Sequence, residues 1–307
     1  MLTSLPSILE KAQKKHYAVG AFNVYNLETV QAVITAADKM KSPVILQTSE
    51  AAIKYAGLEN LGALVHLMAK KTKTPIVFHL DHGKDEKLVV EAIKSGWYCS
   101  VMFDGSALPL KENLKKTKKL VTLAHSKGVA VEAELGAIAG IEDFVSVEER
   151  DARFTDPKQA ADFVRETGCD ALAIAIGTKH GAYKFHGDCQ LDFKRLQEIR
   201  KLVKVPLVLH GASGVPAAVK NLAVKFGAEI SEAKGVSDSA IKKAVSLGIC
   251  KINIDTDLRI AFEAGLHQFI EENPKNLDPR AFLSAGRDLI SKTVEQKIRL
   301  FGSTKKI

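Results

Sequence analysis

Short apolar runs recur along the whole chain, and each has about the length of a β-strand. Apolar residues follow one another in these runs with little alternation, which is typical of strands covered on both faces of a parallel sheet. Eight such runs are present: AVGAFNV (18–24), SPVILQTSE (42–50), TPIVFHLDH (74–82), CSVMFDGS (99–106), VAVEAELG (129–136), ALAIAIGT (171–178), VPLVLHGA (205–212) and CKINIDTD (250–257).

Segments with helical periodicity separate most neighbouring runs. In the segment that follows the first run, for example, Leu27, Val30 and Ile34 fall on one face of a helix. Eight strands that alternate with helices predict a closed (β/α)8 barrel, the TIM barrel, in which helices cover parallel strands. We expect one α/β domain over residues 1–307, with extra helices in a C-terminal extension at about 258–307.

An open, doubly wound sheet is the alternative fold, and the ends of the strands argue against it. An open sheet uses only the strands beside its switch point, whereas a barrel builds its site from the C-terminal ends of all its strands. Polar residues stand at this end of all eight runs: Asn23, Ser49 and Glu50, Asp81 and His82, Asp104 and Ser106, Glu132 and Glu134, His180, His210 and Ser213, and Asn253, Asp255 and Thr256. The pattern therefore favours the barrel.

Composition limits the class of protein and its partners. The chain has 307 residues, 46% of them hydrophobic and 26% charged, which allows a large buried core. The formal charge of +8 comes from scattered lysines and arginines without interleaved aromatic residues, so we expect no nucleic-acid partner. The four cysteines form no CxxC pair, and no apolar run reaches membrane-spanning length. We expect a cytoplasmic protein that does not bind membranes.

Three of the polar residues at the strand ends are histidines, and each is followed directly by glycine. His82, His180 and His210 end the third, sixth and seventh runs. If these strands stand side by side, three imidazoles converge, and three protein nitrogens with one open position are a common way to hold a catalytic zinc ion. A lone histidine in a strand is more often a hydrogen-bonded core residue, which is our interpretation of His79. The repeated context of the other three predicts a metal site.

Neighbouring residues point to phosphate binding and proton transfer. The loops after strands seven and eight of a barrel frequently bind phosphate, and here they begin with Gly211-Ala212-Ser213 and with residues 253–256. Asp81, beside His82, either exchanges a proton during catalysis or supports a metal ligand from behind. A metal ion, an ionisable carboxylate and a phosphate cradle predict that a carbon–carbon bond of a phosphorylated sugar is cleaved or formed.

The motifs at the strand ends resemble those of a known family. The whole chain is similar to class II, zinc-dependent fructose-1,6-bisphosphate aldolases. The motifs that carry the resemblance occur in the expected order: IVFHLDHG (76–83), VEAELG followed three residues later by GIE (131–142), KHGAYK (179–184), LVLHGAS (207–213) and NIDTDLR (253–259). One departure is Ala139, where the family more often has glycine or methionine. Alanine is also small, so this difference affects the loop and not the chemistry.

The resemblance implies roles for the catalytic residues. The three histidines would hold the catalytic Zn²⁺, with Glu132 close by as a further ligand when the metal shifts. Asp81 would handle the proton of the C4 hydroxyl group. Glu142, on the long loop after the fifth strand, would exchange the proton at C3 of dihydroxyacetone phosphate.

The resemblance also implies a substrate site and an assembly. A monovalent cation, Na⁺ or K⁺, is expected near one phosphate, and members of the family are homodimers or homotetramers. Arg259 and Arg280 would reach the second phosphate, one of them from a neighbouring subunit. The full set of substrate contacts is Asn23, Ser49, Gly181, Lys184, Gly211, Ala212, Ser213, Asn253, Ile254, Asp255, Thr256, Arg259 and Arg280.

Three other functions would also fit parts of this sequence pattern. A tagatose-1,6-bisphosphate aldolase would share the metal site, but the stretches IDTDLR and AEISEAKGVSDS look more like the fructose enzymes. A Schiff-base aldolase would use Lys179 or Lys251 and would have no use for three converging histidines. A phosphosugar-binding barrel without catalysis is expected to lack Asp81, Glu142 or one of the histidines, and all are present.

Overall fold

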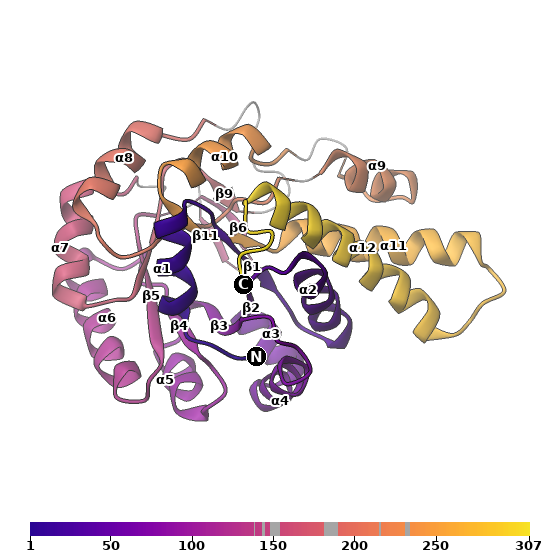
Figure 1. Ribbon diagram of the computed structural model, residues 1–307, viewed down its shortest axis with the longest axis horizontal. Helices are drawn as coiled ribbons and strands as arrows, with labels where there is room; N and C mark the ends of the chain where they lie inside the picture. The colour runs from indigo at the N-terminus through magenta and orange to yellow at the C-terminus, as the bar shows by residue number, and fades with distance from the viewer. Residues whose placement is uncertain (138, 143–144, 148–153, 181–189, 215, 231–233) are drawn as a thin grey trace.

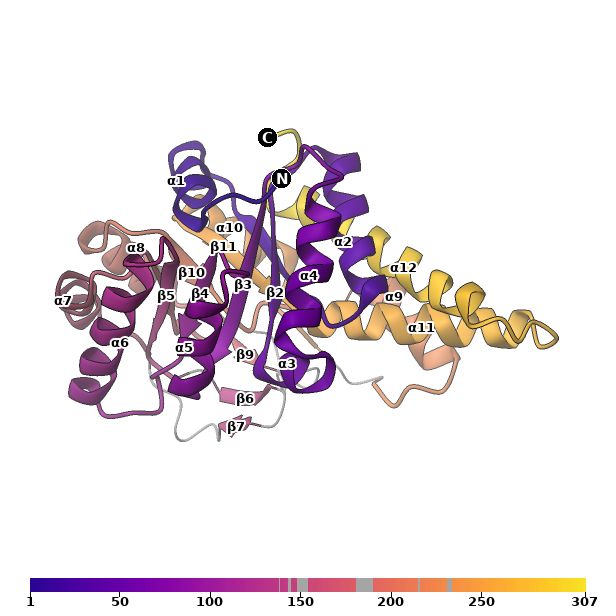
Figure 2. The ribbon, with the colours of Figure 1, turned by 90° about the horizontal axis from the view of Figure 1, so that it is seen from below.

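The computed structural model describes residues 1–137, 139–142, 145–147, 154–180, 190–214, 216–230 and 234–307. Eight parallel strands form a closed barrel in the order β1-β11-β10-β8-β5-β4-β3-β2 (Figures 1 and 2). This confirms the predicted barrel, and one strand overlaps each apolar run. The strands are β1 (Val19–Asn23), β2 (Val44–Thr48), β3 (Ile76–Gly83), β4 (Ser100–Phe103), β5 (Ala130–Leu135), β8 (Ala171–Ile174), β10 (Leu207–Leu209) and β11 (Ile249–Ile254).

Helices cover the outside of the barrel, and their ends follow local capping rules. Helix α2 begins after Asn26, whose side chain accepts a hydrogen bond from the backbone N–H of Thr29 in a capping box. The helices that cover the strands or precede them are α1 (Leu5–Lys15), α2 (Leu27–Met40), α3 (Glu50–Ala56), α4 (Leu58–Ala69), α5 (Glu86–Ser95), α6 (Leu110–His125), α7 (Pro157–Thr167), α8 (Phe193–Leu202), α9 (Ala217–Lys225) and α10 (Asp238–Ser246).

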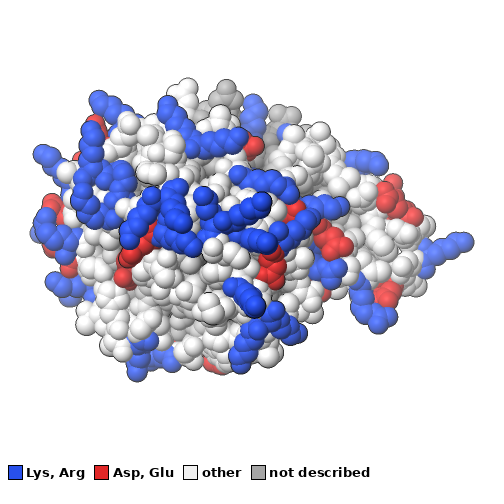
Figure 3. All heavy atoms as spheres, in the orientation of Figure 1, with Lys and Arg blue, Asp and Glu red and all other residues white. Residues whose placement is uncertain are grey.

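Helix α1 closes the N-terminal end of the barrel. Its buried residues Leu5 and Leu9 pack in one cluster with small inward-facing strand residues such as Ala171 and Ala173. Many Lys and Arg side chains lie on this face of the molecule (Figure 3). These charges lie at the opposite end of the barrel from the C-terminal strand ends. They therefore do not line the predicted substrate site.

The chain ends in two long helices, α11 (Thr256–Glu272) and α12 (Pro279–Leu300), which extend beyond the barrel (Figures 1 and 2). The helices approach closely where two glycines face the partner helix. A Cβ at Gly265 would lie 2.7 Å from the Ala285 carbonyl oxygen, and one at Gly286 would lie 2.9 Å from that of Phe262. Helix α12 also packs against α2. No helix among the described residues is long and apolar enough to cross a membrane.

A small second sheet corrects the predicted position of His180. The sixth barrel strand ends at Ile174, and the chain turns at Gly177, which has a φ of +111°. His180 lies in β9 (Lys179–His180), which pairs with β6 (Ala139–Glu142), and β6 pairs with β7 (Val145–Val147). His180 is thus not at the end of a barrel strand, although its sequence context resembles that of His82 and His210.

Candidate active site

Two of the predicted metal ligands meet at the C-terminal end of the barrel. The His82 Nε2 and His210 Nδ1 atoms are 2.6 Å apart, and the two rings are nearly perpendicular at 89°. His82 has a φ of +46°, in the left-handed region that residues with a Cβ rarely adopt, where the pairing of β3 with β4 shifts register. This backbone conformation directs the His82 side chain, and such strain is frequent at functional sites.

In each histidine, a carboxylate contacts the outer ring nitrogen, which is the one that faces away from the other histidine. The Oδ2 atom of Asp104 lies 3.0 Å from His82 Nδ1, and the Oε1 atom of Glu132 lies 2.8 Å from His210 Nε2. Burial lowers the pKa of His210 and so favours the neutral imidazole that metals bind. A carboxylate on the far nitrogen of a metal-binding histidine fixes the ring orientation and raises ligand basicity. These residues therefore fit a metal centre.

The surrounding side chains offer two overlapping groups of ligand atoms. Asp81, His82 and His210 each present an atom within 4.8 Å of the others, and so do His82, Asp104 and Glu134. Burial raises the pKa of Asp104, but the hydrogen bond with His82 and the nearby positive charges outweigh it and hold that pKa below its usual range. The sequence places Asp104 and Glu134 at strand ends but indicates no specific role for them. Only the closed barrel brings them to His82.

Lys251 is a further residue of the site, and the sequence indicated it only as a candidate Schiff-base lysine. Its Nζ atom lies 2.9 Å from Glu132 Oε2 and 2.7 Å from Asn253 Oδ1, and both Lys251 and Glu132 are fully buried. Burial raises the pKa of Glu132, but the charge of Lys251 and the hydrogen bond with His210 hold it well below its usual range. The Lys251 ammonium is thus engaged by two acceptors, which argues against its use as a Schiff-base nucleophile.

Asp81 is held by amide donors on both carboxylate oxygens. Asn253 Nδ2 donates to Oδ1 at 2.9 Å, and Gln47 Nε2 donates to Oδ2 at 2.9 Å. Gln47 Nε2 also donates to Asn23 Oδ1 at 2.7 Å. Because Lys251 can only donate, it requires the oxygen of Asn253 to face it, and the amide NH₂ group then points to Asp81. The sequence signal for Gln47 was a lone amide within an apolar run.

The predicted phosphate loops lie beside the histidines. Gly211 has a φ of +60°, and a Cβ there would lie 2.7 Å from the Lys179 carbonyl oxygen, so this position requires glycine. The second loop connects β11 directly to the first turn of α11, where Thr256 begins the helix. A helix N-terminus presents backbone N–H groups and a positive dipole end, a combination that favours anions.

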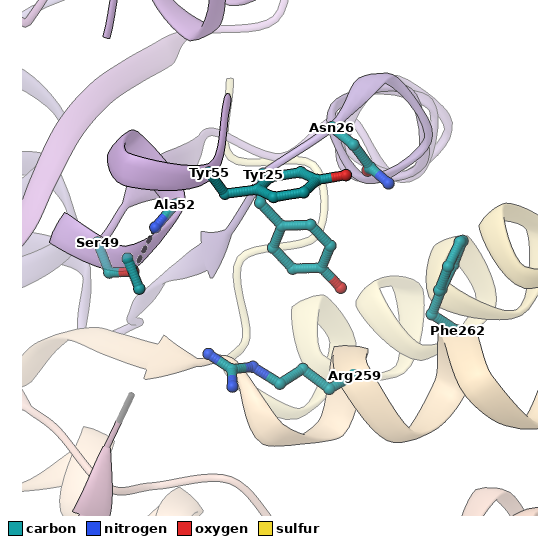
Figure 4. Close-up of a pocket in the computed structure, with 8 residues that line it drawn as sticks. Tyr25, Asn26, Ser49, Ala52, Tyr55, Arg259 and Phe262 are labelled. Carbon is teal, nitrogen blue, oxygen red and sulfur yellow. Dashed lines mark hydrogen bonds between the residues drawn. The ribbon is translucent and has the colours of Figure 1, made fainter. Parts of the chain in front are cut away.

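A pocket of about 500 Å³ lies between helix α11 and the segments that follow β1 and β2 (Figure 4). Ser49 and Arg259, both predicted to contact the substrate, line it. Arg259 forms an ion pair with Asp255, at 2.7 Å, and burial together with Asp255 raises the pKa of Tyr25 to about 12. The residues that line the pocket are Tyr25, Asn26, Ser49, Ala51, Ala52, Tyr55, Arg259 and Phe262.

Comparisons with known proteins identify the family of the chain. The family model for "Fructose-bisphosphate aldolase class-II" matches residues 3–306. The chain belongs to the class II fructose-bisphosphate aldolase family. The fructose-bisphosphate aldolase of Thermus caldophilus is 48% identical over 99% of each chain, and that of Helicobacter pylori strain 26695 is 44% identical over 100% of each. The crystal structure of the YdjI aldolase from Escherichia coli K12 is 36% identical and has a TM-score of 0.80, covering 100% of this chain and 99% of that one.

Membership of this family makes the protein a lyase that acts on a phosphorylated sugar and depends on a metal ion. Some of the predicted site residues lie away from the two histidines or outside the described residues. The side chains of His180 and Glu142, and residues Gly181 and Lys184, lie outside the described part of the chain. Arg280 lies in the first turn of α12 and pairs with Asp278 at 2.7 Å, with its side chain 89% exposed. It does not line the pocket that Arg259 lines.

Proposed function

We propose that this enzyme is a zinc-dependent fructose-1,6-bisphosphate aldolase, which cleaves its substrate reversibly into dihydroxyacetone phosphate and glyceraldehyde 3-phosphate. The observation that carries the proposal is the facing pair of His82 and His210 nitrogens, 2.6 Å apart, beside Asp81. Relatives named for the fructose substrate at 44% and 48% identity support this choice and do not favour tagatose bisphosphate.

The metal would be Zn²⁺, held by His82, His210 and His180, with Glu132 nearby as a further ligand. When bound, the ion supplies Lewis-acid stabilisation of the negative charge that develops on the ketone fragment. Asp104 and Glu132 hold the outer nitrogens of the two imidazoles, so both rings are oriented before any ion arrives. A monovalent cation, Na⁺ or K⁺, would lie near the phosphate of the ketone fragment.

Two carboxylates would move the protons. In cleavage, Asp81 takes the proton of the C4 hydroxyl group while the C3–C4 bond breaks, and C4 becomes the aldehyde carbon of glyceraldehyde 3-phosphate. The electron pair of the broken bond stays with C3 of the ketone fragment, and Glu142 delivers a proton to C3. The side-chain amides of Asn253 and Gln47 each donate a hydrogen bond of 2.9 Å to the Asp81 carboxylate and so fix its position.

The two phosphate groups would occupy opposite ends of the site. Loop residues Gly211–Ser213 and Asn253–Thr256, with Gly181 and Lys184, would bind the phosphate of dihydroxyacetone phosphate. Asn23, Ser49 and Arg259 would contact the other half of the substrate. The exposed position of Arg280 is compatible with its reaching the site of a neighbouring subunit in a homodimer or homotetramer. We further propose that the enzyme acts in the cytoplasm.

Metal analysis combined with a cleavage assay tests this proposal. We expect stoichiometric zinc, loss of cleavage after EDTA treatment, recovery with zinc, and faster cleavage of fructose than of tagatose bisphosphate. His82→Ala and His210→Ala should lose both zinc and activity, whereas His125→Ala, at a surface site paired with Asp170, should keep both. Cleavage that survives EDTA, with borohydride trapping of the substrate, would contradict the metal mechanism. An equal or reversed substrate preference would contradict the fructose assignment.

A further inference from the structure

A buried ion pair lies outside the catalytic centre and connects the two C-terminal helices. Lys297 Nζ on α12 lies 2.7 Å from Asp257 Oδ2 on the first turn of α11, with the two side chains 5% and 0% exposed. The neighbouring pair on α12, Arg299 with Glu295, has its arginine side chain 55% exposed. Burying two charges costs solvation free energy that their attraction often fails to recover, so stability alone does not explain a pair of this kind.

Both charged groups lie against the loop that follows His210. The same Asp257 Oδ2 atom accepts a hydrogen bond from the backbone N–H of Gly214 at 3.1 Å. A Cβ at Gly214 would lie 3.1 Å from Lys297 Nζ, so glycine at this position leaves room for the ammonium group. The backbone N–H of Val236 also donates to the Ser213 carbonyl oxygen at 3.2 Å. The loop backbone is thus held by two hydrogen bonds, one with Asp257 and one with Val236.

We propose that Lys297 and Asp257 are positioning residues that hold the backbone of Gly211–Gly214 in the shape that binds the substrate phosphate. This inference rests on the proposed function, in which that loop binds dihydroxyacetone phosphate. Asp257 fixes the Gly214 N–H, and Lys297 neutralises Asp257. Without Lys297, the negative charge of Asp257 would lose this counter-charge beside an anion site and would oppose phosphate binding.

Charge-selective variants separate this role from simple stabilisation. Lys297→Met leaves the Asp257 charge beside the loop, and we expect it to weaken phosphate binding and raise KM for fructose 1,6-bisphosphate by about tenfold, the order expected for one charge near the site. The turnover number kcat should change by less than about twofold, because neither residue touches the reacting atoms. Adding Asp257→Asn removes the charge but keeps an oxygen that can accept from Gly214, so phosphate affinity should recover to within about threefold of the unmodified enzyme.

The measurements are kcat and KM in the cleavage assay and, on the zinc-loaded enzyme, calorimetric titration with inorganic phosphate. Arg299→Met is the matched control, because it breaks an exposed ion pair on the same helix, and it should leave both phosphate affinity and KM unchanged. Thermal unfolding gives the temperature below which each variant is folded. All assays are done at one temperature at which every variant is folded.

A lower melting temperature of Lys297→Met with unchanged KM and phosphate affinity would overturn the proposal and leave the pair a structural one. If Lys297→Met does not fold, Asp257→Asn provides the test, because it changes the charge beside the loop in the opposite direction. It leaves a positive charge beside the loop, so phosphate affinity should stay level or rise, and a tenfold loss would overturn the proposal. Phosphate binding is measured without turnover, so an enzyme that fails to cleave fructose 1,6-bisphosphate would refute the proposed function and still test this pair.

Discussion

Lys251→Met tests whether the interior of the barrel depends on a compensated charge. Lys251 Nζ lies 2.9 Å from Glu132 Oε2, and both side chains are fully buried. Breaking such a pair leaves a buried carboxylate without its counter-charge, which typically costs about 3–5 kcal/mol. The entropy of unfolding of a 307-residue chain is roughly 0.6 kcal/mol per degree, so the melting temperature should fall by about 5–8 °C.

The pH dependence of this loss gives a second, more specific signature. In the unmodified enzyme, burial raises the pKa of Glu132, but the charge of Lys251 and the hydrogen bond with His210 together outweigh it and hold the pKa below the ordinary value of 4.5. The pair therefore contributes stability above pH 4.5 that is lost as the pH falls through the lowered pKa. In Lys251→Met, burial dominates, and the pKa of Glu132 should rise above 4.5. The stability difference between the two proteins should then be largest at neutral pH and shrink as the pH falls toward 4.5.

Thermal unfolding followed by circular dichroism, with and without zinc, measures both effects. Lys39→Met is the matched control, because its partner Glu295 is 2.8 Å away but Lys39 is 65% exposed, and such a pair is worth less than about 1 kcal/mol. Combining Lys251→Met with Glu132→Gln should restore most of the lost stability. The reasoning is refuted if Lys251→Met melts like Lys39→Met, or if the stability difference grows as the pH falls.

Three further predictions concern the metal and the substrate. Asp104→Asn should weaken zinc affinity by about 10–100-fold in a chelator competition assay, because it removes the carboxylate that orients His82, and unchanged affinity would contradict that role. His180→Ala should release zinc on dialysis if its side chain completes the site, whereas full retention would exclude it as a ligand. Arg259→Met should raise KM for fructose 1,6-bisphosphate about tenfold and leave C3 proton exchange of dihydroxyacetone phosphate unchanged, and an equal loss of exchange would place Arg259 elsewhere in the site.

The fold could be predicted because its signals are local. Each barrel strand overlaps one apolar run, and the helices between the strands carry their own periodicity and capping residues. The ends of the strands were predicted less accurately than the number and order of the strands. The sixth run suggested a strand over 171–178, but β8 ends at Ile174 because the chain turns at Gly177, where the left-handed backbone leads His180 into a separate sheet. Similar local sequences thus led to different positions for His180 and His210.

The sequence by itself determined which residue types reach the C-terminal end of the barrel, because side-chain alternation and strand direction follow from the chain alone. It did not determine which of them touch. Glu132 and Glu134 stand two residues apart on β5 and face the same way, yet Glu132 meets His210 and Lys251, while Glu134 lies in the group around His82. That choice depends on the register between strands far apart in sequence, which only closure of the barrel sets. The same closure turned three similar histidine motifs into two facing imidazoles and one residue on a neighbouring sheet.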